Sequence, residues 1–215
     1  KLTKNKYKFK PAKNFYHELS AQDCSVQLSG ELKNQAVMVM KIANDLRWMN
    51  SGPLAGISDI ELKALQPGSS IMPGKVNPVI PEAVAMASAD VIGNDVSITV
   101  AAQSGNFQLN VMLPVIAYNL LKSINLLSGS MNSLSKNAIK TFKVNHKNLE
   151  ISLSKNPILV TALNPLIGYE KASSIAKKAY KENRPIIDVA AEETDIAKSK
   201  LIKLLDPSKL ARGGL

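Results

Sequence analysis

The chain has 215 residues, of which 45% are hydrophobic, and a formal net charge of +10. A chain of this length and composition can bury a substantial core, which excludes the disordered class. Its single cysteine, Cys24, excludes an internal disulfide framework. His17 and His146 are the only histidines. We therefore expect no zinc or iron centre, and no metal or other cofactor.

The positive charge does not form a continuous stripe along the sequence. Lysines crowd into residues 1–13 and recur after residue 139, but Lys122 is the only basic residue between Lys75 and Lys136. Proteins that bind nucleic acid combine a basic stripe with a recognisable module or aromatic platforms, and only 5% of this chain is aromatic. We expect no nucleic-acid partner. No run of eighteen apolar residues is free of Asn, Asp, Gln, Lys and Glu, so we expect no membrane span.

The first half of the chain is predicted to form a long helix followed by a long loop. Apolar residues recur every three to four positions between about residues 20 and 50, which predicts one helix that stops at Ser51 and Gly52. Gly, Pro and Ser recur through residues 51–80, an unusually long connection of the kind that often carries function. Pro81 and Glu82 then suit the first turn of a new helix.

Two later stretches, residues 82–102 and 107–135, are predicted to be long helices with very few charges. A helix that is apolar on most faces must be buried on most faces. A chain of this size cannot surround two such helices, so we expect neighbouring subunits to complete the bundle. The polar residues within them would need partners there, namely Asn106, Gln108, Asn110, Asn119 and Asn125.

After about residue 145 the sequence changes to short, lysine-rich segments separated by prolines and Gly168. The fold class is therefore predicted to be all-α. We expect two domains: residues 1–145 form part of a long-helix bundle that includes the loop at 68–78, and residues 146–215 form a small helical domain.

Residues 68–78 (GSSIMPGKVNP) are the most informative stretch. Glycines on both sides of Ser69 and Ser70 allow unusual backbone angles and close approach to a small ligand, and Lys75 offers a positive charge. This combination is suited to holding a carboxylate near a nucleophile or base. A phosphate-binding P-loop is excluded, because five residues rather than four separate the glycines, Val76 follows the lysine, and a loop rather than a strand precedes it.

The same stretch resembles the signature loop of the fumarase/aspartase superfamily. Further stretches resemble class II fumarate hydratases, so the similarity covers nearly the whole chain: residues 41–48 (KIANDLRW), 51–53 (SGP), 104–110 (SGNFQLN), 159–164 (LVTALN) and 167–172 (IGYEKA). The resemblance implies reversible, metal-free conversion of fumarate to L-malate in a homotetramer. Four fused bundles would form its core, and three subunits would build each active site.

The resemblance also implies roles for individual residues. Removing a proton next to a carboxylate creates a doubly charged aci-carboxylate, which the site must stabilise electrostatically. Ser69 would be the catalytic base and Ser70 would position it or the substrate. Lys75 and Asn77 would bind the substrate carboxylate, and Glu82 would pair with a catalytic histidine from another subunit. Residues 54–73 would close over the substrate.

Each of these residues also has a plain structural interpretation. Paired serines before a Pro-Gly turn are common in loops, a lone lysine is most often solvated, and an Asn before a proline often starts a turn. Glu82 can simply complement the helix dipole. Lys41, Asn44 and Arg47 could organise the site or could be the polar face of an amphipathic helix, and the second interpretation is at least as strong.

The sequence departs from the family pattern near its start. Residues 14–18 (NFYHE) only approximate the expected motif, and neither His17 nor His146 has the context of the catalytic histidine. The upstream family segments are missing and the chain starts without Met, so we expect it to be the C-terminal half of the enzyme and inactive alone. Aspartate ammonia-lyase and a non-catalytic assembly fragment remain alternatives. The expected location is the cytoplasm, or the mitochondrial matrix in a eukaryote.

Overall fold

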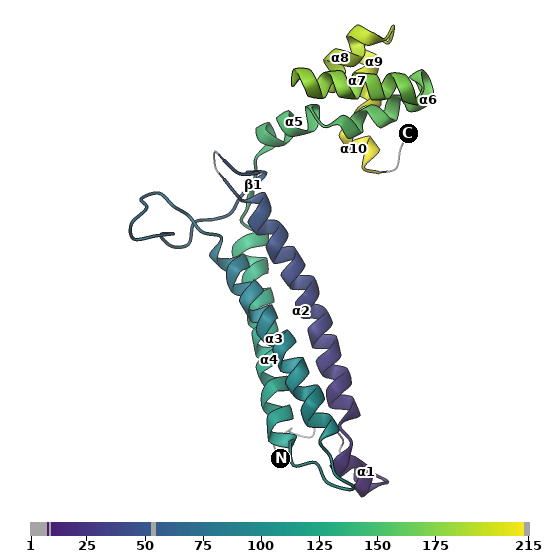
Figure 1. Cartoon of the computed structure of the whole chain (residues 1–215). Helices are drawn as coiled ribbons and strands as arrows, with labels where there is room; N and C mark the ends of the chain where they lie inside the picture. Colours follow the sequence, from purple (N-terminus) through teal and green to yellow (C-terminus); the bar gives the residue numbers. More distant parts are fainter. Residues whose placement is uncertain (1–7, 9, 53–54, 213–215) are drawn as a thin grey trace. The chain divides into compact units, whose positions relative to one another are not determined.

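The computed structural model describes residues 8, 10–52 and 55–212, and it divides into two compact units, Lys1–Lys143 and Val144–Leu215. The first unit is a bundle of long helices joined by one long loop (Figure 1). Its elements are α1 (Phe15–Ser20), α2 (Asp23–Met49), β1 (Ile60–Glu61), α3 (Val79–Gln103), α4 (Leu113–Leu134) and the π-helical turn η1 (Ser135–Ile139). β1 pairs with β2 (Lys143–Val144), where this unit ends.

The second unit consists of short helices: α5 (His146–Ser154), the 3-10 helix η2 (Pro157–Leu163), α6 (Asn164–Ile167), α7 (Tyr169–Glu182), α8 (Ile186–Glu193), α9 (Lys198–Leu204) and α10 (Pro207–Leu210). The side chain of Asn145 caps α5 by accepting a hydrogen bond from the backbone N–H of Asn148. The all-α fold class is confirmed, because helices dominate the described residues and the two strands have two residues each.

The helix α3 is the centre of the bundle, since it packs along both α2 and α4 (Figure 1). Three layers of buried side chains follow one another along these helices. One lies near the long loop and includes Val39, Ala43 and Val84. The middle layer contains Ala36, Val91 and Leu127, and the far layer contains Ile98, Ala101 and Ile116.

Polar groups of α3 fix its position relative to both neighbours. Asp95 is 6% exposed and accepts hydrogen bonds from Ser29 Oγ and Lys33 Nζ of α2, both at 2.6 Å. Toward α4, Asn94 Nδ2 donates to Ser123 Oγ at 3.1 Å. Such pairs satisfy buried polar groups only in one register, so they select a single alignment of the helices.

By length and apolar composition alone, α3 could cross a membrane. Its buried Asn94 and Asp95 are instead paired with α4 and α2, as expected for the core helix of a bundle. Lys122 Nζ of α4 also contacts Asp90 Oδ1 at 2.8 Å, which brings a third polar residue of α3 into the bundle. These pairs explain how α3 accommodates Asp90, Asn94 and Asp95 in a largely apolar sequence.

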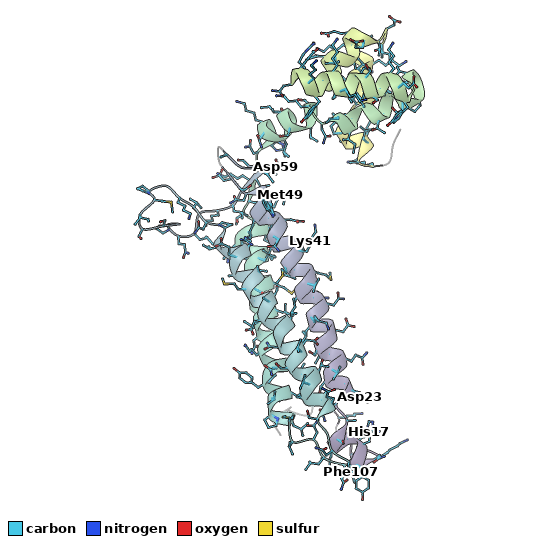
Figure 2. All side chains as sticks on the ribbon, in the orientation of Figure 1. His17, Asp23, Lys41, Met49, Asp59 and Phe107 are labelled. Carbon is cyan, nitrogen blue, oxygen red and sulfur yellow. The ribbon has the colours of Figure 1, made fainter. Side chains whose placement is uncertain are left out.

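The predicted helix at 107–135 begins later than expected, at Leu113. Residues 104–112 instead form the turn between α3 and α4, in which Phe107 has a positive φ of 50° and a side chain 97% exposed (Figure 2). Asn110 holds this turn. Its Nδ2 donates to the carbonyl of Ala101 at 3.0 Å, and its Oδ1 accepts from the N–H of Met112 at 2.8 Å.

The partners predicted for the polar residues of this region are therefore local. Asn110 bonds to the end of α3, Asn119 Nδ2 donates to the carbonyl of Val115 in its own helix, and Asn106 Nδ2 donates to the carbonyl of Ser104. Gln108 and Asn125 are exposed. None of these bonds requires another subunit.

The Asp95 cluster should make the stability of the bundle depend on pH. Burial raises the pKa of Asp95, but the hydrogen bonds from Lys33 and Ser29 and the charge of Lys33 outweigh it, so the pKa lies below its usual value. The ionised carboxylate therefore adds stability above the unfolded pKa of about 3.9, and this contribution is lost as the pH falls through the folded pKa.

We predict that Asp95→Asn lowers the free energy of unfolding at pH 7 by about 1–3 kcal/mol, and that the difference from wild type shrinks below pH ~4. Urea denaturation followed by the fluorescence of Trp48, the single tryptophan, reports on this unit. Asp90→Asn is the matched control and should cost less, because the Asp90 side chain is 41% exposed. Equal losses at pH 7 and pH 3 would contradict the ionic role.

The second unit has its own core, which includes Leu163, Ile175, Ile186 and Val189. Val189 is fully buried, whereas Ile202 of α9 is 54% exposed. We predict that Val189→Ala destabilises this unit by about 1–3 kcal/mol and that Ile202→Ala changes its stability by less than about 0.5 kcal/mol. Hydrogen exchange of residues 144–212, measured by mass spectrometry, would test both. Similar exchange in the two variants would mean that this core is not the one described.

Candidate functional site

The signature loop projects from the end of the bundle where α2 ends and α3 begins (Figure 1). Two hydrogen bonds across the loop close its base, one between backbone groups and one from a side chain. The N–H of Gly68 donates to the carbonyl of Lys75 at 2.8 Å, and Asn77 Nδ2 donates to the carbonyl of Gly68 at 3.1 Å. These bonds bring together the Gly68 and Asn77 ends of the stretch, which are nine positions apart in sequence.

Both glycines of the signature are required by this geometry. A Cβ at position 68 would lie 2.5 Å from the carbonyl oxygen of Lys75, closer than side-chain carbons approach backbone. Gly74 has a φ of +81°, a conformation that residues with a side chain rarely adopt. The spacing of the two glycines is therefore a condition for closing the loop on itself.

The structure places Ser69 within this closed loop and gives its hydroxyl one donor. Ser69 Oγ accepts a hydrogen bond from the backbone N–H of Ile71 at 3.2 Å, and the residue is half-buried. Ser70 and Lys75 are exposed. A backbone N–H directed at a hydroxyl oxygen favours the ionised form of that hydroxyl, which is the requirement for a serine that acts as a base.

Asn77 has a structural task that the sequence did not predict. One of its amide hydrogens closes the loop on Gly68. An Asn amide carries two hydrogens, so a second donor and the side-chain oxygen remain for other partners. Asn77 can therefore support the loop and still offer a donor to a ligand.

The structure places Glu82 apart from the serines, in the first turn of α3. It lines a cleft of about 410 Å³ whose other walls come from the C-terminal end of α2, the start of the long loop and Pro78. The lining residues are Asn44, Arg47, Trp48, Asn50, Ser51, Gly52, Pro78 and Glu82. Ser69, Ser70, Lys75 and Asn77 are not among them, so within the described part of the chain the predicted residues form two groups rather than one.

Two residues at the end of α2 organise the cleft and were missed by the sequence analysis. Asn50 Oδ1 accepts from the N–H of Leu62 at 2.7 Å, and Ser51 Oγ accepts from the N–H of Ile57 at 3.1 Å while donating to the carbonyl of Trp48 at 2.6 Å. The signal was present, because Asn and Ser directly after a helix commonly bond to the backbone that follows. Pro53, and Leu54 at which the predicted lid of residues 54–73 begins, lie outside the described residues.

On α2, the polar residues Asn44 and Arg47 contact each other, with Arg47 Nη1 donating to Asn44 Oδ1 at 3.1 Å. Both line the cleft with Glu82. Lys41 lies one turn earlier and points away from the bundle, where it pairs with Asp45 (Figure 2). The cleft therefore uses Asn44 and Arg47 but leaves Lys41 on the polar face.

The two histidines lie elsewhere. His17 is exposed on α1, near Glu18 and Asp23, at the opposite end of the bundle from the signature loop (Figure 2). His146 is exposed in the first turn of α5. Across the described residues, no group of three or more His, Cys, Asp or Glu side chains could hold a metal ion.

Two family models match the chain. One, described as "Lyase", matches residues 1–93, and one described as "Fumarase C C-terminus" matches residues 159–212. Among curated proteins, the chain is 63% identical over 207 residues to "Fumarate hydratase class II 2" of Pseudomonas aeruginosa, covering 96% of this chain and 45% of that protein. It is 46% identical over 203 residues to the class II fumarate hydratase of Oceanobacillus iheyensis, covering 94% and 44%.

Solved structures agree with these matches. A fumarate lyase:delta crystallin from Brucella melitensis, described as bound to cobalt, superimposes with a TM-score of 0.88 at 41% identity, over 94% of this chain and 44% of that one. A class II fumarase from Schistosoma mansoni gives a TM-score of 0.86 at 34% identity, over 94% and 42%.

The chain thus spans somewhat less than half the length of the relatives that it matches. The matches nevertheless extend over almost all of its own residues, and they include both the bundle and the second unit. Sequence and fold lead to the same assignment. The chain belongs to the class II fumarate hydratase family of the fumarase/aspartase superfamily.

Proposed function

We propose that the protein containing this chain catalyses the reversible hydration of fumarate to L-malate. The observation that carries the proposal is the 63% identity over 207 residues to a protein curated as a class II fumarate hydratase. The geometry of the signature loop adds a chemical reason. It presents a hydroxyl next to a backbone donor, on a loop that also carries a lysine and an amide.

Ser69 is the proposed base. In the dehydration direction it removes the proton from the malate carbon next to a carboxylate, which gives the aci-carboxylate. The hydroxyl on the adjacent carbon then leaves from the opposite face as water, with a proton from the catalytic histidine of another subunit. The N–H of Ile71, which bonds to Ser69 Oγ at 3.2 Å, stabilises the ionised serine. One such donor is too little for a hydroxyl of this weak acidity, so further donors must come from the assembled site.

Lys75, Asn77 and Ser70 are the proposed binders of the dicarboxylate. Lys75 and Ser70 are exposed on the loop, and Asn77 keeps one amide hydrogen after closing the loop. A lysine charge and a neutral amide together match a carboxylate whose negative charge grows as the proton leaves. The glycine-dependent closure between positions 68 and 75 holds these groups on one short segment.

Glu82 is proposed to act through a histidine supplied by another subunit. It lies in a cleft beside Asn44 and Arg47, which is open in the single chain. A carboxylate that accepts a hydrogen bond from a histidine fixes the tautomer of the imidazole and raises the basicity of the imidazole. Assembly would then bring together the two groups of residues that a single chain holds apart.

A homotetramer is proposed because Glu82 would act through a histidine from another subunit. The surface of the bundle supports this proposal. The central helices expose large apolar side chains that the single chain leaves uncovered: Met86, Val96, Val100, Tyr118, Leu121 and Ile124. Such a surface on a soluble bundle marks an interface. The described part of the loop at 55–73 is proposed to close over the substrate, and the protein to act in the cytoplasm or, in a eukaryote, in the mitochondrial matrix.

The substrate assignment is tested by incubating the intact protein with fumarate in water, with and without ammonium, and identifying the products by NMR. We predict malate in both samples. Aspartate formed only with ammonium, and no malate, would replace the hydratase by an aspartate ammonia-lyase that uses the same loop. No turnover of fumarate in either sample would favour a non-catalytic assembly fragment.

The base assignment is tested by Ser69→Ala in the intact protein. We predict that kcat falls by about 10²–10⁴-fold, the usual contribution of a general base, with little change in stability because Ser69 lies on a loop. Ser174→Ala is the control, since Ser174 is an exposed serine of α7 in the other unit. Turnover of Ser69→Ala within a few-fold of wild type would show that another group removes the proton.

A further inference from the structure

The second unit contains a pocket of about 800 Å³ that the proposed reaction does not use. Three segments form it: η2 with α6, α9, and α10 with Arg212 two residues beyond it. Its lining residues are Ala162, Pro165, Leu166, Lys200, Lys203, Leu204, Lys209 and Arg212. The volume lies in the range of about 300–1,000 Å³ that is typical of sites for small organic molecules.

Four positive charges surround this pocket. Lys200 and Lys203 are three residues apart on α9, so they lie on one face of that helix, and Lys209 and Arg212 follow from the next segment. Within the described residues, no carboxylate forms an ion pair with any of the four. A concave surface lined by charges of one sign concentrates counter-ions of the opposite sign.

In the described part of this unit, several other cations are paired with carboxylates, whereas the four cations at the pocket are not. Arg184 pairs with Glu182 and Glu192, and Lys178 Nζ contacts Glu193 Oε1. The carboxylates of these pairs lie on α7 and α8, outside the segments that line the pocket. Asp206, at the start of α10, interacts electrostatically with Lys209 but forms no ion pair with it, so the four cations at the pocket outnumber the carboxylate beside them.

The floor of the pocket is apolar. Ala162, Pro165 and Leu166 come from η2 and α6, and Leu204 of α9 adds a fourth apolar residue. An inorganic ion would leave this floor uncovered. A ligand that carries several negative charges at one end and an apolar ring at the other would use both parts of the lining.

We propose that this pocket binds an organic polyphosphate, with the phosphates among Lys200, Lys203, Lys209 and Arg212 and an apolar ring on the floor formed by Ala162, Pro165 and Leu166. Lysine and arginine are the usual phosphate-binding residues, and four cations match three or four negative charges better than they match a dicarboxylate. The proposal does not depend on the reaction proposed above.

Isothermal titration of the intact protein tests the site, with ATP and inorganic tripolyphosphate as probes, no divalent cations and about 0.1 M salt. We expect saturable binding of both probes at one site per chain, with ATP tighter because tripolyphosphate has no ring. The double variant Lys200→Gln/Lys203→Gln should weaken the binding of both probes by at least about tenfold. Lys177→Gln/Lys181→Gln removes the same charge from exposed positions of α7 and should change binding less than about twofold.

A single substitution separates the two parts of the pocket. The Leu166 side chain is 52% exposed, so Leu166→Ser should leave the unit folded. This substitution should weaken the binding of ATP but not the binding of tripolyphosphate. No saturable binding of either probe would overturn the proposal, and so would equal weakening by the two double variants, which would indicate attraction to net charge only. A peptide rich in Asp and Glu that binds while both phosphate probes fail would assign the pocket to a protein partner instead.

Discussion

The alignment of α3 between α2 and α4 is the constraint on which the first unit depends. Apolar layers alone would allow these helices to slide by one turn, because Ala, Val, Ile and Leu recur along all three. The buried carboxylate of Asp95 can accept hydrogen bonds from Ser29 and Lys33 in one alignment only. Asn94 can donate to Ser123 in that same alignment. Since the signature loop connects the ends of α2 and α3, this alignment also sets the positions from which the loop begins and ends.

Much of this architecture follows from the sequence. The apolar spacing predicted α2 to within about three residues at either end. The start of α4 was predicted too early, because residues 107–112 are as apolar as the helix that follows. The turn that delays the start of α4 is held by the hydrogen bond from Asn110 to the end of α3 and by the positive φ at Phe107. Local composition predicts neither of them.

The candidate site shows the same division. The residues of the loop could be selected from sequence because their types and spacing are unusual, and the structure supplies the reason for the two glycines. The placement of Glu82 in a different cleft could not be predicted, since it depends on how the end of α2 packs beside the start of α3. The second task of Asn77 was hidden for a similar reason, because its partner is a backbone carbonyl nine residues away.

The exposure of the signature loop also bears on how readily proteases cleave the chain. Ile71 is 83% exposed and Val76 is 48% exposed, and both lie in a segment without regular secondary structure. Proteases cut such segments most readily. The signature loop is therefore also the part of the first unit at which a protease would most readily cut the single chain.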